Sequence, residues 1–173
     1  VLFYNDYSTT GSAKRTCIYN MVADMKARGI PIDAVGHQMH NSLTSPSVQS
    51  MVDTINLLAP LGIDQQATEM DIGIGNSFTA ANEIPDSVLA RQGYLVRDMF
   101  NAFRQLKGKL SSITFWGMSD DHTWLTSATK IDAPLLFDLS GHAKPAYWGI
   151  VDPSKLPGAG LTASNGPALP VPA

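Results

Sequence analysis

Short apolar segments alternate with longer segments of helical periodicity along most of the chain. In residues 47–61, for example, Met51, Ile55 and Leu58 recur at helical spacing, and Ser47 stands where a helix N-cap is expected. The shorter apolar segments have the length of strands. The pattern predicts strands at 1–4, near 31–36, within 63–72 and at 112–116, with helices at 12–28, 47–61, 85–106 and from about 145.

This alternation of strands and helices predicts a parallel sheet with right-handed crossovers, in one of two architectures. The chain is either half of a (β/α)8 barrel or a small doubly wound sheet. A doubly wound nucleotide-binding sheet requires a glycine-rich turn after its first strand, but residues 5–11 read Asn-Asp-Tyr-Ser-Thr-Thr-Gly. Polar or aromatic residues instead close every predicted strand, and barrel enzymes place their chemistry at those carboxyl ends. The sequence therefore favours an α/β fold of the (β/α)8 TIM-barrel type.

Composition narrows the classes of function. The net charge is −3 and the charged residues form no block of like sign, which argues against a nucleic-acid partner and against a polybasic membrane anchor. No apolar run approaches the roughly 18 residues that span a bilayer, so no membrane partner is expected. The single cysteine, Cys17, excludes an internal disulfide and is expected to be a packed thiol.

The chain is expected to comprise one folded domain and a tail. Proline, glycine and alanine dominate after Asp152, so residues 1–152 are predicted to form the domain and 153–173 a tail or linker without its own core. Residues 1–4 read as a strand already under way, without a starting methionine. We therefore expect the chain to be a portion of something larger.

Two carboxylates, Glu69 and Asp71, stand two residues apart at the end of the third predicted strand. Side chains alternate between the two faces of a strand, so both should point to the same side. Two like charges on one face are unfavourable unless a partner or a function compensates. They are either a functional pair or a solvated pair at the rim. The only other glutamate, Glu83, follows Asn82 before Pro85 and is interpreted as a helix-start signal.

Gln38 and His40 share a face in the same way, at the end of the second predicted strand. An imidazole beside Glu69 would hold that carboxylate ionised and oriented, with Asp71 fixing the ring from its other side. A lone histidine in a core is usually structural, and this alternative stays open. No further His or Cys stands at ligand spacing, so no metal site is expected.

Two of the three tryptophans lie at or soon after the last predicted strand. Trp116 ends that strand beside polar residues, and Trp124 follows in the next loop. Sugars present apolar C–H faces ringed by hydroxyl groups, which suits stacking on aromatic rings. The alternative is that a tryptophan after an apolar strand fills the core, which is the role expected for Trp148.

At these motifs the sequence resembles glycoside hydrolase family 10, the β-1,4-xylanases. That family carries N-D-Y at its fifth strand, G-x-Q-x-H at the sixth, T-E-x-D at the seventh and F-W-G-x-S-D at the eighth. The same motifs stand here in the same order, at residues 5–7, 36–40, 68–71 and 115–120, and the likeness extends to about residue 152. The resemblance implies that the chain supplies roughly strands 5 to 8 of a (β/α)8 barrel, with their helices.

The resemblance also implies a role for each motif residue. Glu69 looks like the nucleophile that forms the covalent glycosyl–enzyme intermediate, with His40 and Asp71 as its support. The substrate-binding residues would be Asn5 and Tyr7 on the leaving-group side, Gln38 near the acid/base group, and the walls of the sugar subsites, Trp116 and Trp124. Retaining glycosidases need a second carboxyl group about 5–5.5 Å from the nucleophile. The family's acid/base glutamate belongs to the fourth strand, upstream of Val1.

The function that follows is retaining endo-hydrolysis of β-1,4-xylosidic bonds in xylan or xylo-oligosaccharides. It would require the N-terminal half-barrel, as a separate chain or in the same polypeptide. The alternative is a non-catalytic xylan-binding or assembly fragment, and a nucleotide-binding domain is disfavoured by the missing glycine-rich turn. The mechanism needs no cofactor or metal, because carboxyl groups supply the nucleophile and the protons. Since xylan lies outside cells, a secreted or extracellular location is expected.

Overall fold

The computed structural model describes residues 1–75 and 78–158, and a parallel sheet lies at its centre. The strands follow the spatial order β1, β2, β4, with β5 on the far side of β4 and β3 alongside the end of β4. Every pair is parallel, as the sequence predicts. The strands are β1 (Phe3–Asp6), β2 (Ala34–His37), β3 (His40–Ser42), β4 (Asp64–Gly73) and β5 (Ser112–Phe115).

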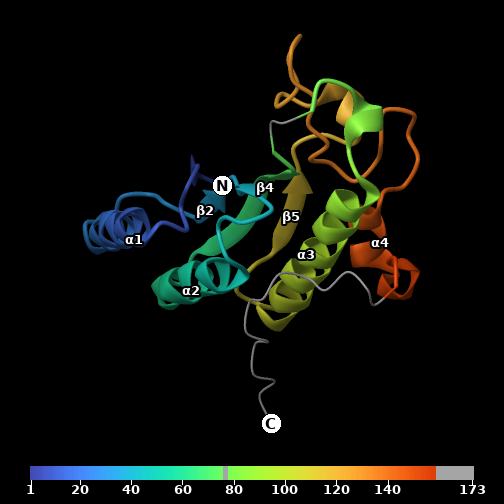
Figure 1. The fold of residues 1–173 in the computed structure, drawn as a ribbon. Coiled ribbons are helices and arrows are strands. Elements are labelled where there is room, and N and C mark those ends of the chain that lie inside the picture. Colours follow the sequence, from blue (N-terminus) through green and yellow to red (C-terminus); the bar gives the residue numbers. More distant parts are fainter. Residues whose placement is uncertain (76–77, 159–173) are drawn as a thin grey trace.

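The helices lie side by side along one face of this sheet, in chain order (Figure 1). Each of the four predicted helices is present and ends within a few residues of its predicted bounds. Ser47 is an N-cap as predicted, because its Oγ accepts a hydrogen bond from Ser50 N at 3.2 Å. The α-helices are α1 (Ser12–Ala27), α2 (Val48–Leu58), α3 (Asp86–Gln105) and α4 (Pro145–Val151), and the short 3-10 helices are η1 (Ala59–Leu61), η2 (Ala81–Glu83), η3 (Asp120–His122) and η4 (Pro153–Lys155).

The main core lies between the sheet and the helices. Ala67, Met70 and Ile72 of β4 are buried there, and they pack with Ile55 of α2 and Met99 of α3 among others. Such contacts are expected, because a strand with apolar residues at every second position and a helix with apolar residues at every third or fourth position each present one apolar face to the core. Cys17 does not follow its prediction, because it is exposed on the outer surface of α1.

A short strand that was not predicted, β3, follows the second predicted strand after a break in the backbone. β2 ends at His37, and β3 begins at His40. Between them Met39 has a φ of 57°, in the left-handed region that a strand residue does not adopt. Gln38 and His40 therefore do not belong to one continuous strand, although both reach the same hollow, as described below.

A buried histidine ties the sheet to the loop that follows β1. His37 is fully buried, and its ring nitrogens lie 2.8 Å from Thr9 Oγ1 and 3.2 Å from Gln65 Oε1. Burial lowers the pKa of His37 to about 4, although the hydrogen bond to Gln65 opposes this shift. The neutral ring is therefore structural, and it fixes Thr9 two residues after Tyr7.

The two outer strands, β1 and β5, each have one strand partner within residues 1–75 and 78–158. Every residue of β2, in the middle of the sheet, is buried, whereas β1 is partly exposed and its Phe3 is 40% exposed. Unpaired edges with exposed apolar residues are sites where further strands add to a sheet. The arrangement is an open, partial barrel.

The last described residues pack against α3. Leu156 is buried and contacts Gly93 of α3, and Tyr94 Oη donates a hydrogen bond to Pro157 O at 2.5 Å. The first residues of the predicted tail therefore pack on the domain, while 159–173 lie outside the described residues. Within the described ranges, no helix has the length and apolar character needed to cross a membrane.

Candidate active site

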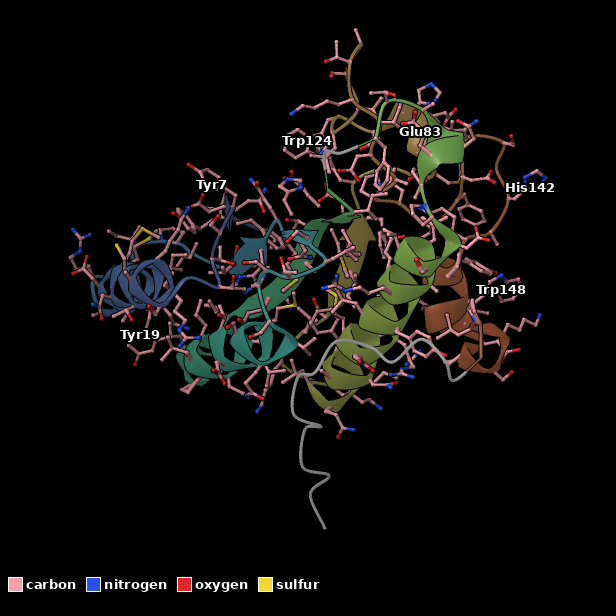
Figure 2. The ribbon with its side chains drawn as sticks, in the orientation of Figure 1. Tyr7, Tyr19, Glu83, Trp124, His142 and Trp148 are labelled. Carbon is pink, nitrogen blue, oxygen red and sulfur yellow. The ribbon has the colours of Figure 1, made fainter. Side chains whose placement is uncertain are left out.

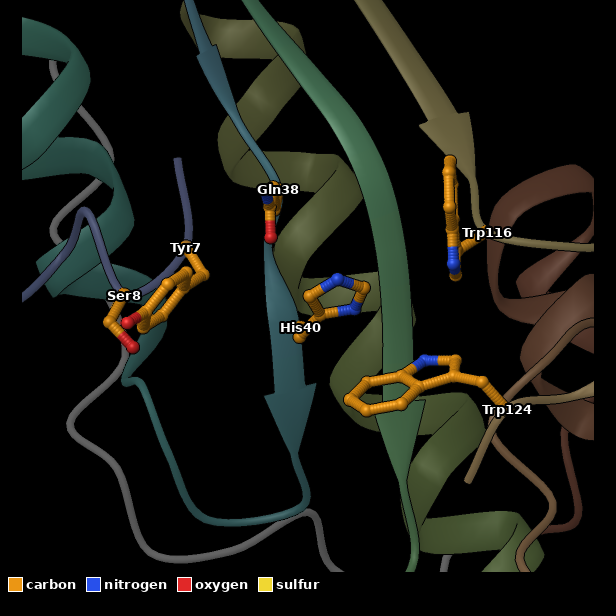
Figure 3. A pocket seen from close by; sticks show the side chains of 6 residues that line it. All are labelled: Tyr7, Ser8, Gln38, His40, Trp116 and Trp124. Carbon is orange, nitrogen blue, oxygen red and sulfur yellow. The ribbon is translucent and has the colours of Figure 1, made fainter. Parts of the chain in front are cut away.

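A hollow of about 470 Å³ opens at the carboxyl end of the sheet. Side chains that follow β1, β2 and β5 line it together, as the predicted barrel geometry requires. Figure 3 shows two tryptophans on one side of the hollow, Tyr7 and Ser8 on the other, and Gln38 and His40 between them. The lining residues are Tyr7, Ser8, Gln38, His40, Trp116 and Trp124.

His40 lies between the two predicted carboxylates. Its Nδ1 is 2.8 Å from Asp71 Oδ2, and its Nε2 is 3.3 Å from Glu69 Oε2. Glu69 and Asp71 therefore point to the same face of β4, as the period-two argument predicts. The Asp71 side chain is only 1% exposed and that of Glu69 is 15% exposed, so neither is the solvated rim pair of the alternative interpretation.

Trp124 belongs to the same hydrogen-bonded group. Its indole Nε1 donates to Asp71 Oδ2 at 2.8 Å, and its ring meets the His40 ring edge-on, with centroids 5.0 Å apart. Trp124 is 59% exposed and Trp116 is 49% exposed, which excludes the core-filling alternative for both. Trp148 is half-buried under the ammonium group of Lys155, which lies 3.9 Å from its ring centroid.

Asn5 does not line the hollow and contacts Glu69 instead. Its Nδ2 donates to Glu69 Oε1 at 2.9 Å, and its Oδ1 accepts from Thr68 Oγ1 at 2.6 Å. Both Glu69 oxygens are thus held, one by Asn5 and one by His40. The sequence indicated no role for Thr68. In a regular strand its side chain would face away from that of Glu69, but a bulge in β4, described below, turns it toward Asn5.

Sequence reasoning also missed the residues that hold Tyr7. Asp6 Oδ1 accepts from the Tyr7 backbone N at 2.8 Å and pairs with Lys14 Nζ at 2.8 Å, while Asp6 Oδ2 accepts from Tyr4 Oη at 2.6 Å. Burial opposes ionisation of Asp6, but the hydrogen bonds from Lys14, Tyr4 and Tyr7 together lower its pKa. The bond to Asp6 raises the pKa of Tyr4 to about 12. Lys14 Nζ also lies 3.9 Å from the Tyr7 ring centroid and makes a cation–π contact with the ring.

A buried ion pair braces the long loop that carries Trp124. Lys144 Nζ donates to Asp120 Oδ2 at 2.7 Å, to Ala133 O at 2.6 Å and to Leu135 O at 2.7 Å, and both charged side chains are 4% exposed. Burial raises the pKa of Asp120 and lowers that of Lys144, while their mutual attraction opposes both shifts. The Asp at the end of the F-W-G-x-S-D motif therefore serves the loop and not the hollow.

Glu83 and the remaining histidines lie elsewhere. Figure 2 shows Glu83 at the short helix η2 and His142 on a loop, both well apart from Tyr7. The Glu83 carboxylate accepts from the backbone N of Thr79 at 2.8 Å and of Ala80 at 3.2 Å, so it caps the start of η2, of which it is the last residue, and not the start of α3 as predicted. Across the described residues, no three His, Cys, Asp or Glu side chains gather as a metal site would require.

Known proteins of one family are similar to this chain along nearly all of its described residues. The family model described as Glycosyl hydrolase family 10 matches residues 1–153. The chain belongs to glycosyl hydrolase family 10. Its fold is accordingly part of a (β/α)8 barrel, and both the predicted family and the predicted fold are confirmed.

Relatives in family 10 are similar along nearly the whole chain. The thermostable celloxylanase of Thermoclostridium stercorarium is 38% identical over 160 residues, which cover 90% of this chain and 41% of that protein. The structure of a family 10 protein from Paenibacillus barcinonensis is 41% identical in sequence and superposes with a TM-score of 0.83. The match covers 91% of this chain and 47% of that one. An intracellular xylanase of Thermoanaerobacterium saccharolyticum, solved as a variant with xylotetraose, is 36% identical with a TM-score of 0.77, over 87% of this chain and 44% of that one.

The chain spans less than half the length of these family 10 relatives. Together with the open edges at β1 and β5, this coverage identifies the described structure as a partial barrel. The part that is present brings the predicted site residues together at the carboxyl end of the sheet, namely Tyr7, Gln38, His40, Trp116 and Trp124 around the hollow, with Asn5, Glu69 and Asp71 bonded beside it.

Proposed function

We propose that this chain contributes the nucleophile half of an enzyme that hydrolyses β-1,4-xylosidic bonds in xylan with retention of configuration. Glu69 is the nucleophile. The observation that carries the proposal is the setting of its carboxylate, with Oε1 held by Asn5 at 2.9 Å and Oε2 facing His40 at 3.3 Å, beside a hollow walled by aromatic rings. The xylanase names of the relatives support the substrate class.

The group around His40 prepares Glu69 for attack. The two ring nitrogens of His40 face Asp71 and Glu69, so the ring is held by one carboxylate and orients the other. With Asn5 on its second oxygen, the Glu69 carboxylate is fixed beside the hollow, and a carboxylate is the form that attacks an anomeric carbon. Trp124 supports Asp71 from the other side by donating its indole N–H to the same oxygen that faces His40.

Aromatic side chains define where sugar rings would lie. Trp116 and Trp124 expose about half of their surfaces on one side of the hollow and would wall the subsites next to the scissile bond. Tyr7, on the opposite side in Figure 3, would line the leaving-group side. Gln38 lies between these walls, where it would orient the region around the acid/base group.

Retention requires a second carboxyl group, about 5–5.5 Å from the nucleophile, which acts first as acid and then as base. None of the described residues that line the hollow carries a carboxyl group, and Glu83 is engaged in its own loop. We place the acid/base group on an N-terminal half-barrel that pairs with the free edges of β1 and β5. This partner is part of the same polypeptide or a separate chain, and we call the assembly of both halves the completed barrel.

The test is a matched pair of glutamate substitutions in the completed barrel. Glu69→Gln removes the nucleophilic oxygen and should abolish release of reducing sugar from xylan, whereas Glu83→Gln makes the same chemical change outside the hollow and should leave the rate near that of the parent. The proposal is wrong if Glu69→Gln retains the parent rate, or if both variants lose activity equally.

A second candidate function is favoured by the coverage of less than half of each relative. The chain by itself would then bind xylan through Trp116, Trp124 and Tyr7 without turnover, as a binding or assembly fragment. Loss of a positioned proton donor typically costs about 10²–10⁴-fold in rate, and more for a poor leaving group. Xylan hydrolysis by the isolated 173 residues at the rate of the completed barrel would rule this candidate out.

We further propose that the completed protein acts outside the cell, because its polymeric substrate lies there. The T. saccharolyticum relative is described as an intracellular xylanase, so members of the family differ in location. Xylanase activity in the culture medium of intact producing cells would support the proposal, and activity confined to the cell extract would contradict it.

A further inference from the structure

The middle of β4 departs from regular strand geometry beside the proposed nucleophile. Its register with β5 shifts between Ala67 and Met70, and both of these residues are buried in the core that faces the helices. Thr68 and Glu69, the two residues between them, both bond to Asn5. Two consecutive side chains therefore face the same side of the strand, as a β-bulge allows and a regular strand does not.

Asn5 reaches these two residues from β1 by crossing over β2. In the sheet, β2 lies between β1 and β4, and Asn5 is the register partner of Gly36 in β2. A Cβ atom at Gly36 would collide with Asn5 Oδ1 and would lie 2.9 Å from Thr68 Cγ2. Because Gly36 has no side chain, the Asn5 amide passes over β2 and meets both Thr68 and Glu69.

The two contacts of the Asn5 side chain determine which way its amide points. Oδ1 accepts from Thr68 Oγ1 at 2.6 Å, and Nδ2 donates to Glu69 Oε1 at 2.9 Å. A reversed amide would place its oxygen against the Glu69 carboxylate, where neither atom can donate. The hydroxyl of Thr68 gives the amide oxygen a donor on the opposite side, so it favours the orientation in which the NH2 group faces Glu69.

We propose that Thr68 is a positioning residue that acts on the nucleophile through Asn5, in the space that Gly36 leaves. The inference rests on the proposed function, because it takes Glu69 as the nucleophile. Asn5 itself does not line the sugar-binding hollow, so its effect is expected on the carboxylate and not on substrate binding.

The positioning matters most in the second chemical step. Water oxygen then bonds to the anomeric carbon, and the bond between that carbon and Glu69 breaks with its electron pair remaining on the carboxylate. The proton of the water passes to the partner's carboxyl group, which acts as the base. A hydrogen bond to a charged form stabilises that form, so an oriented Asn5 amide assists the departure of Glu69 as its charge returns.

The experiment uses Thr68→Val, which removes the hydroxyl and keeps the shape, in the completed barrel. With an aryl xylobioside whose leaving group is good, the second step limits turnover. We expect kcat to fall about 10-fold, the lower end for a hydrogen bond to a charged group, with a parallel fall in KM that leaves kcat/KM nearly unchanged. Gly36→Ala displaces the amide and should lower kcat at least as far.

Two controls separate a positioning role from a structural one. Thr68→Ser keeps a hydroxyl and should restore most of kcat. Thr16→Val removes a hydroxyl that bonds to Ser12 O within α1 and does not line the hollow, so it should leave kcat unchanged. The inference is overturned if Thr68→Val keeps the parent kcat, if the Val and Ser variants lose kcat equally, or if kcat/KM falls while KM stays constant.

Glu69→Gln in the same assay separates a failure of the proposed function from a failure of the positioning role. Hydrolysis that survives this substitution overturns the proposed function, and the positioning role with it. An inactive Glu69→Gln enzyme beside a Thr68→Val enzyme of parent kcat overturns the positioning role alone.

Discussion

Replacing Lys144 with methionine should destabilise the loop that carries Trp124. The ammonium group donates three hydrogen bonds, to Asp120 and to the carbonyls of Ala133 and Leu135, in a place where both charged side chains are 4% exposed. Methionine fills a similar volume but donates none of these bonds, so the carboxylate of Asp120 is left buried without its counter-charge.

The magnitude follows from what remains after the substitution. Asp120 keeps one donor, the backbone N of Leu135 at 2.8 Å, and Ala133 O keeps Gln92 Nε2 at 2.8 Å, but Leu135 O loses Lys144. Removing one partner of a buried ion pair costs about 3–5 kcal/mol. We expect the free energy of unfolding of the completed barrel to fall by this amount.

Urea unfolding of the completed barrel measures the effect, with a double-variant cycle to assign it. Adding Asp120→Asn to Lys144→Met removes the orphaned charge and should recover a large part of the lost free energy. Lys107→Met, at an exposed lysine, should change it by less than about 0.5 kcal/mol. A loss below about 1 kcal/mol for Lys144→Met, or no recovery in the double variant, would refute the reasoning that this pair is sealed from water.

Three further predictions concern His37, buried in the sheet, and two residues beside the hollow, Trp124 and Lys14. Burial lowers the pKa of His37 from 6.5 to about 4, so below pH 6.5 the imidazole takes up a proton in the unfolded chain before it does so in the folded protein. Urea titrations should therefore show the free energy of unfolding falling by about 3 kcal/mol as the pH drops from 6.5 to 4. Trp124→Phe keeps an aromatic face but loses the donor to Asp71, so kcat/KM on xylan should fall about 10-fold or more. Lys14→Met removes the cation under Tyr7 and should raise KM for xylotetraose a few-fold, as expected from about 0.5–1 kcal/mol, without changing kcat.

A control variant accompanies each of these three predictions. His37→Gln should remove most of the acid dependence, whereas His142→Gln, at an exposed histidine, should leave it unchanged. Trp116→Phe should cost less than Trp124→Phe, because the described structure gives the Trp116 indole no bond to Asp71. For the lysine beneath Tyr7, Lys107→Met is the comparison, and an equal change of KM in both variants would contradict the prediction.

The sequence predicted those parts of the molecule that depend on periodicity. The alternation of apolar segments predicted the positions of the helices and the parallel arrangement of the strands. The alternation of side chains along a strand predicted that Glu69 and Asp71 lie on one face of β4. It could not give the break at Met39 or the bulge at Thr68, because each depends on a local backbone conformation that leaves no mark in an apolar pattern.

Contacts between distant segments were also beyond sequence reasoning. Lys144 and Asp120 are separated by a long loop, and nothing in their spacing indicates a buried pair. Asn5 resembled a sugar-contacting residue through its motif, yet the glycine at position 36 lets it cross a strand to reach Glu69. A motif thus located the site, while the sheet order determined which side chains meet.

The central claim is that Glu69 forms a covalent bond with the sugar. A 2-deoxy-2-fluoro xylobioside with a good leaving group slows both chemical steps and allows the intermediate to accumulate on the completed barrel. We predict that peptide mass spectrometry will find the added disaccharide mass on the peptide that contains Glu69, together with loss of activity. Label on a different residue, or xylan hydrolysis that proceeds with inversion and leaves no label, would contradict the account.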